Sequence, residues 1–199
     1  LYGSRRNIIT DELKKGLINI LIQIPLPFMI ITSFLHRYDS NIKENIIKTF
    51  FYSLVAYILM PTISYLLLKP IKKEKRKILH FANIFVNTGY IGFPILHSMY
   101  GPEGVVYGSI FNMFFVLLVW TYGITIFKGN LTRKEILLEL RDALLNPSIL
   151  AVFLGILIMY FDIQLPEVLK KASREIGQLT GPLSMMIIGS GLAKVKIKK

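Results

Sequence analysis

The sequence predicts an all-α membrane protein with about six transmembrane helices, and three observations support this fold class. Of its 199 residues, 53% are hydrophobic and only 18% are charged, whereas soluble domains usually carry about 25% charged residues. The charged residues cluster in short segments between long uncharged runs. Lys and Arg are concentrated in alternate connecting segments, as is typical of a multi-pass membrane protein.

Six uncharged runs are each long enough to cross a bilayer, which takes roughly 17–25 residues. They are residues 17–35, 49–68, 81–100, 105–127, 143–161 and 176–193. A soluble helical bundle would carry polar stripes at helical spacing, and the second, fourth and fifth runs carry none. The first run is too long for a signal peptide and no small-residue cleavage site follows it. We therefore expect all six runs to be membrane spans.

The basic residues predict the orientation of these spans. Of the 24 Lys and Arg, 18 lie before the first run, between the second and third, between the fourth and fifth, and after the sixth, and 6 lie in the other connecting segments. Because cytoplasmic loops are enriched in Lys and Arg, we expect the first set, and both ends of the chain, in the cytoplasm. Topology thus accounts for the net charge of +12, and we expect a lipid bilayer and no nucleic acid as partner.

The third run is rich in polar and helix-breaking residues, namely Asn83, Asn87, Thr88, Gly89, Gly92 and Pro94. Pro94 lacks a backbone donor and its ring clashes with the carbonyl of Tyr90, and the two glycines loosen the same turn. The pattern predicts a helix broken near the middle of the membrane. Half-helix N-termini attract anions, and transporters place binding sites at such breaks. The alternative is a proline kink with close-packed glycines and Asn side chains that bond between helices.

A weak internal repeat occurs at an offset of 155 residues, where Glu12, Lys15, Gln23 and Pro27 align with Glu167, Lys170, Gln178 and Pro182. The first and sixth spans cross in opposite directions, so the repeat is inverted, as in many secondary transporters. With five spans per unit, residues 1–127 form most of the first repeat, 128–142 a cytoplasmic linker that contains a short surface helix, and 143–199 the start of the second. One helix would then precede Leu1 and about three would follow Lys199.

Several motifs are similar to those of the auxin efflux carrier family in its bacterial branch. They are Asn87-Thr-Gly-Tyr-Ile-Gly-Phe-Pro94, Tyr100-Gly-Pro-Glu-Gly104, Ser109-Ile-Phe-Asn112, Asn146-Pro-Ser148 and Gly181-Pro-Leu-Ser-Met-Met-Ile-Ile-Gly189. The resemblance implies a ten-helix transporter of two inverted five-helix repeats. In each repeat the fourth helix is broken at a proline, and the two breaks cross at the substrate site. Prokaryotic members are linked to malate, malonate and other small organic acids. This fragment would lack the first helix and the second crossover.

The resemblance also implies which residues bind substrate. Pro94 resembles the crossover proline, and Asn112 lies where plant carriers have polar residues near the substrate. Pro27, with Pro25, resembles the irregular second helix. The expected polar side of the break consists of Asn83, Asn87, Thr88, Gly89, Tyr90 and Gly92. The expected substrate is a small organic anion such as a carboxylate or dicarboxylate, carried by a permease of the prokaryotic plasma membrane.

Other functional classes find less support. The chain has no cysteine, and His36, His80 and His97 lie near span ends without shared ligand spacing, so we expect interfacial histidines and neither a metal nor a cofactor. The spans hold no paired Asp, HExxH or acidic metal–phosphate motif of a membrane enzyme. A non-transporting membrane scaffold or receptor remains the alternative, although it has no need of a polar, broken span. The sequence leaves a homodimer open.

Overall fold

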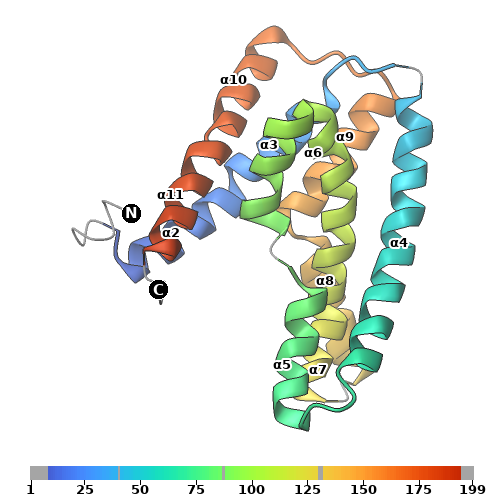
Figure 1. Ribbon diagram of the computed structural model, residues 1–199. Helices are drawn as coiled ribbons and strands as arrows, with labels where there is room; N and C mark the ends of the chain where they lie inside the picture. The colour runs from blue at the N-terminus through green and yellow to red at the C-terminus, as the bar shows by residue number, and fades with distance from the viewer. Residues whose placement is uncertain (1–8, 40, 87, 130–131, 194–199) are drawn as a thin grey trace.

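The computed structural model describes residues 9–39, 41–86, 88–129 and 132–193, and these residues form helices joined by short turns, with no β-strand among them (Figure 1). The expected all-α class is confirmed. The helices are α2 (Asp11–Gln23), α3 (Pro25–Phe34), α4 (Ile42–Leu67), α5 (Lys73–Ile84), η1 (Thr88–Gly92), α6 (Phe93–Leu118), η2 (Val119–Gly123), α7 (Ile124–Lys128), α8 (Arg133–Leu144), α9 (Pro147–Tyr160), α10 (Glu167–Gln178) and α11 (Thr180–Leu192).

Three helical segments of the described chain are long and apolar enough to cross a membrane, whereas six were expected. They are Asp11–Phe34, Ile42–Leu67 and Phe93–Lys128, and α8 with α9 forms a fourth candidate that is bent by 59°. The difference arises because the third and sixth runs do not form single helices. Residues 81–100 are divided by a break after Ile84, and residues 176–193 are shared between α10 and α11, which are separated by Leu179.

The first span bends at Ile24, between α2 and α3. Ile24 has φ −122° and ψ −76°, outside the helical region, and Pro25 follows at the start of α3. Proline is well suited to a first helical turn because the N–H that it lacks would have no partner there. The irregular helix expected at Pro25 and Pro27 is therefore present, and both prolines are buried.

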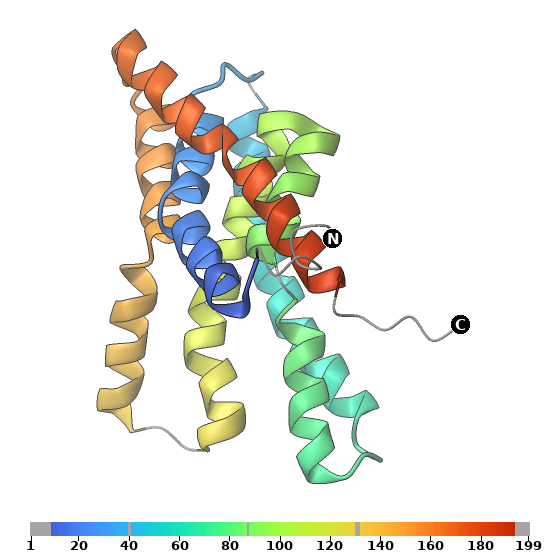
Figure 2. The ribbon, with the colours of Figure 1, turned by 90° about the vertical axis from the view of Figure 1, so that its left-hand side faces the viewer.

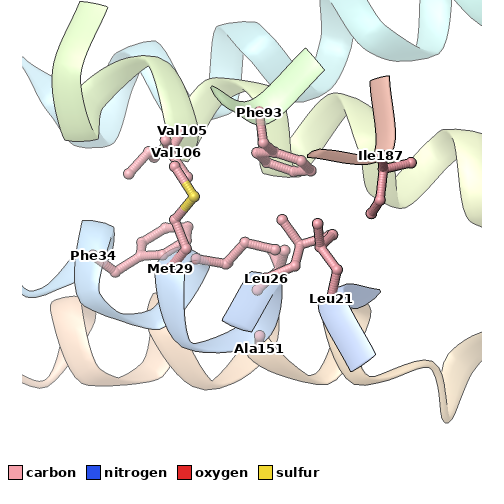
Figure 3. Packing of buried hydrophobic residues seen from close by; sticks show 11 residues of the cluster. Leu21, Leu26, Met29, Phe34, Phe93, Val105, Val106, Ala151 and Ile187 are labelled. Carbon is pink, nitrogen blue, oxygen red and sulfur yellow. The ribbon is translucent and has the colours of Figure 1, made fainter. Parts of the chain in front are cut away.

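Helix α3 lies at the centre of the described bundle and packs against α9, α10 and α6. In Figure 3, Met29 and Phe34 of α3 lie opposite Val105 and Val106 of α6, which are fully buried. Glycine permits the close approach of α10. A Cβ at Gly177 would lie 2.9 Å from the backbone N and Cα of Met29, so the two helices touch through their backbones.

The connecting segments gather at two ends of the bundle (Figures 1 and 2). The α4–α5 turn, the end of α7 and the start of α8 lie at one end, which carries the basic residues of 69–77 together with Lys128, Arg133 and Lys134 and is called the basic end below. The end of α3, the start of α4, the α9–α10 turn and the kink of α6 lie at the opposite end (Figure 1). Gly101 has φ +63°, a conformation that glycine adopts without strain, and there α6 folds back on itself. Two basic segments thus share one end, as the charge distribution predicted.

Helix α8 begins with a capping box, in which Thr132 Oγ1 accepts from the backbone N of Glu135 and Glu135 Oε2 accepts from the backbone N of Thr132 at 2.8 Å. This reciprocal pair satisfies two of the free N–H groups at a helix start. The helix expected within residues 128–142 is therefore present, and it extends to Leu144.

Candidate functional site

The polar third run contains a true interruption of the helix (Figure 1). Helix α5 ends at Ile84, and Phe85 follows at φ −103° and ψ 69°. Helical structure resumes at Thr88 in the π-helical turn η1 and continues into α6, with Pro94 in its first turn. The predicted break is confirmed. It lies between Ile84 and Thr88, before the proline, and the π-helical turn η1 separates it from Pro94.

A side-chain hydrogen bond joins η1 to the second half of α6, which follows the kink at Gly101. Thr88 Oγ1 donates to Asn112 Oδ1 at 2.8 Å. Asn112 is only 5% exposed, and with its oxygen occupied its two amide N–H groups remain for another partner. The structure therefore brings together two of the predicted site residues.

Gly89 and Asn112 line a cavity of about 510 Å³, which we call the break cavity. Its other polar lining residues are Asn19 and Gln23, one turn apart on α2, with Asn146 and Ser148 at the start of α9. Apolar and aromatic side chains complete the walls, among them Phe85 and Trp120. A mostly apolar cavity with a few converging polar groups is the usual form of a small-molecule site.

The N-terminus of α9 opens onto the break cavity. Asn146 caps this helix, with its Oδ1 accepting from the backbone N of Ser148 at 3.0 Å, and Pro147 and Ser148 also line the cavity. The partial positive charge of a helix N-terminus favours an anion. The polar contribution to the cavity thus comes from amides, a glycine backbone and a helix end. The lining residues of the break cavity include no charged side chain.

The other described residues of the predicted set do not line this cavity. Asn83 is exposed and its Nδ2 lies 3.4 Å from Ser64 Oγ of α4. Pro27 is buried in α3. Gly92 lines a cavity between α4 and α6, and Pro94 lines one beside α3 and α10. Asn87 and the side chain of Tyr90 lie outside the described residues.

Four polar residues of the break cavity were not predicted as site residues, namely Asn19, Gln23, Asn146 and Ser148. The signals for them are visible in the sequence. Asn19 and Gln23 are polar residues spaced by four within the first apolar run, and Asn146 opens a motif shared with the family. Their convergence depends on the packing of α2 and α9 around the break, which the spacing of residues along the chain does not reveal.

A second polar cluster joins α4, α5 and η2. The His80 ring lies 2.9 Å from Ser64 Oγ through Nδ1 and 2.8 Å from Tyr122 Oη through Nε2. His80 is only 7% exposed, so the expectation of an interfacial histidine is wrong for this residue. A neutral imidazole donates through one nitrogen and accepts through the other, and the two hydroxyls can take either role. The cluster therefore satisfies a buried polar ring and ties the basic end together.

Comparisons with known proteins agree with this arrangement. A family model described as membrane transport protein matches residues 1–199. An uncharacterized transporter of Methanocaldococcus jannaschii is 28% identical over 201 residues, which cover 96% of this chain and 64% of that protein. The chain thus spans less than two thirds of the length of this curated relative. Because the family model covers the whole sequence, the chain belongs to the membrane transport proteins of the auxin efflux carrier-like family.

Proposed function

We propose that the protein containing this chain is a secondary transporter of small organic anions, such as carboxylates or dicarboxylates, that works by alternating access around the broken helix. The observation that carries the proposal is the break cavity, in which the backbone at Gly89, the amide of Asn112 and the N-terminus of α9 face one space of about 510 Å³. Amide N–H groups and helix ends bind a carboxylate through hydrogen bonds that are strengthened by its charge.

The break also has a cavity on its other side, as alternating access requires. Thr88 and Gly92 line a cavity of about 790 Å³ next to α4, together with Tyr52, Glu103 and Tyr107. Thr88 therefore borders this cavity, and its hydrogen-bond partner Asn112 borders the break cavity. A small displacement of η1 relative to the second half of α6 would open the break to one of these two cavities and close it to the other.

The helix boundaries between α2 and α3 and between α10 and α11 support the inverted repeat on which this mechanism depends. Helix α2 ends at Gln23 and α10 ends at Gln178, and the residues that separate the helices are Ile24 and Leu179. Both pairs are separated by the 155 residues of the sequence repeat. Helices α2 and α11 contact each other. Inverted repeats of this kind place a substrate site between their two halves.

The test is anion uptake by liposomes that contain the full-length protein, with radiolabelled malate and malonate as substrates. We expect Asn112→Ala to lower the rate of uptake by about tenfold or more, because it removes the partner of Thr88 and an amide that would bind the charged substrate. Ser109→Ala is the matched control. Ser109 is equally buried on the same helix, but its hydroxyl donates only to the carbonyl of Val106.

Two results would contradict the proposal. In the first, the wild-type protein is inserted and folded but shows no uptake or exchange of small carboxylates. This result would favour a non-transporting receptor or scaffold. Alternatively, Asn112→Ala would transport at the wild-type rate, which would place the substrate site elsewhere in the protein.

A further inference from the structure

A third cavity, which we call the outer cavity, lies toward the end opposite the basic end. It has a volume of about 570 Å³ and lies between α3, the first half of α6, α10 and α11. Its polar lining residues include His36, His97, Ser98, Arg174 and Gln178. Pro94, in the first turn after the break, also lines it, so the outer cavity adjoins the broken segment.

The charge of the outer cavity is positive. Arg174 makes no hydrogen bond or ion pair with any other described residue, unlike Lys170 on the same helix, which contacts Glu167 at 3.0 Å. The lining residues of the outer cavity include no carboxylate. A guanidinium with no partner, at the edge of a cavity without acidic groups, attracts an anion.

The sequence repeat relates the outer cavity to the break cavity. Arg174 and Gln178 stand 155 residues after Asn19 and Gln23, and each pair occupies the last turns of a helix that ends at the glutamine. Asn19 and Gln23 line the break cavity, and Arg174 and Gln178 line the outer cavity. The two repeats therefore present equivalent positions to cavities toward opposite ends of the bundle, with a guanidinium replacing an amide in the outer one.

We propose that the outer cavity is a docking site for the organic anion on the side of the protein away from the basic end, with Arg174 as its principal ligand. This inference rests on the proposed function. The planar guanidinium fork matches a carboxylate with two parallel hydrogen bonds. Gln178, one turn away, supplies amide N–H donors for a second carboxylate. A cavity of about 570 Å³ is of the size usual for small-molecule sites.

The Arg174 guanidinium would also bind the phosphate of an anionic lipid. The experiment therefore distinguishes the organic anion from a lipid headgroup as its ligand. The first measurement is the KM for radiolabelled malate uptake by the full-length protein in liposomes of neutral lipid. We expect Arg174→Gln to raise KM about tenfold or more with little change in the maximal rate, because docking is weakened while the break is intact. Arg174→Lys, which retains the charge but not the fork, should give an intermediate KM.

Lys171→Gln is the control, since it removes the same charge from the same helix at an exposed residue outside the cavity. Its KM should equal that of the wild type. Equal KM values for Arg174→Gln and the wild type would overturn the outer site while leaving the transport proposal intact.

Binding of malate to the purified protein, measured by thermal stabilisation, separates the two proposals. Stabilisation that depends on Arg174, in a protein that transports no carboxylate, would support the site and contradict the transport function. If phosphatidylglycerol stabilises the wild type through Arg174 and malate does not, the cavity holds a lipid headgroup and the docking proposal is wrong. The absence of any stabilisation that depends on Arg174 would equally overturn it.

Discussion

Two buried polar residues, Asn112 and His80, each join neighbouring helical segments of the described bundle. Asn112 fastens the restarted helix through Thr88, and His80 joins α4 to η2 through Ser64 and Tyr122. Other hydroxyls on α4 differ from Ser64, since Ser53 and Thr62 donate to carbonyls four residues earlier in their own helix. A hydroxyl that bonds between helices at membrane depth secures their packing.

His80→Ala should therefore lower the free energy of unfolding by roughly 1–3 kcal/mol, because it leaves the buried Ser64 hydroxyl without its histidine partner and breaks the hydrogen bond to Tyr122. The measurement is thermal or denaturant unfolding of the purified protein in detergent. Tyr122→Phe should cost less, since it removes one of the two hydrogen bonds.

The double variant His80→Ala with Tyr122→Phe tests whether the cluster acts as a unit. Its loss of stability should be smaller than the sum of the two single losses, because the partners share one interaction. Strictly additive losses would show that the His80–Tyr122 hydrogen bond contributes nothing to stability.

At the scale of helices, close backbone approach decides where α10 lies. Gly177 meets the backbone of Met29, and Gly155 of α9 meets the ring and Cβ of Phe34. Helix α3 is thus held between two neighbours through glycine contacts, which is how membrane helices gain packing without a hydrophobic driving force. This packing sets the position of Arg174 and Gln178, on either side of Gly177.

Gly177→Ala should destabilise the protein by about 1–3 kcal/mol, because the added Cβ would lie 2.9 Å from backbone atoms of Met29, which cannot rotate away. Gly181→Ala is the control, since a Cβ there meets nothing within 4 Å. The measurement is again unfolding of the purified protein. Equal stability of both variants would mean that α3 and α10 pack less closely than described.

At the scale of the whole molecule, the bundle exposes much apolar surface. Helix α4 is 17% buried over its most apolar window, and Phe51, Ile58 and Leu67 on it are all more than half exposed. The lipid bilayer covers such surface in a membrane protein. We predict that the basic end faces the cytoplasm, because cytoplasmic loops are enriched in Lys and Arg.

The topology can be tested with cysteine labelling, since the 199 residues contain no cysteine. We expect Lys72→Cys at the basic end to react with a membrane-impermeant maleimide only after the cells are opened. Gln164→Cys, between α9 and α10 at the opposite end, should react in intact cells. Any native cysteine in the rest of the protein would first be replaced by serine. The reverse pattern of labelling would invert the orientation.

The sequence by itself determined the membrane class, the helix break and the repeat offset, because hydrophobic length, proline with glycine, and residue identities are local properties of the chain. It also named Gly89 and Asn112, which line one cavity in the structure. Only the tertiary structure decided that Asn19, Gln23 and Asn146 join them, that Asn83 lies elsewhere and that His80 is buried. Such convergence follows from the packing of distant helices, and a residue's spacing within its own helix does not specify which neighbour it meets.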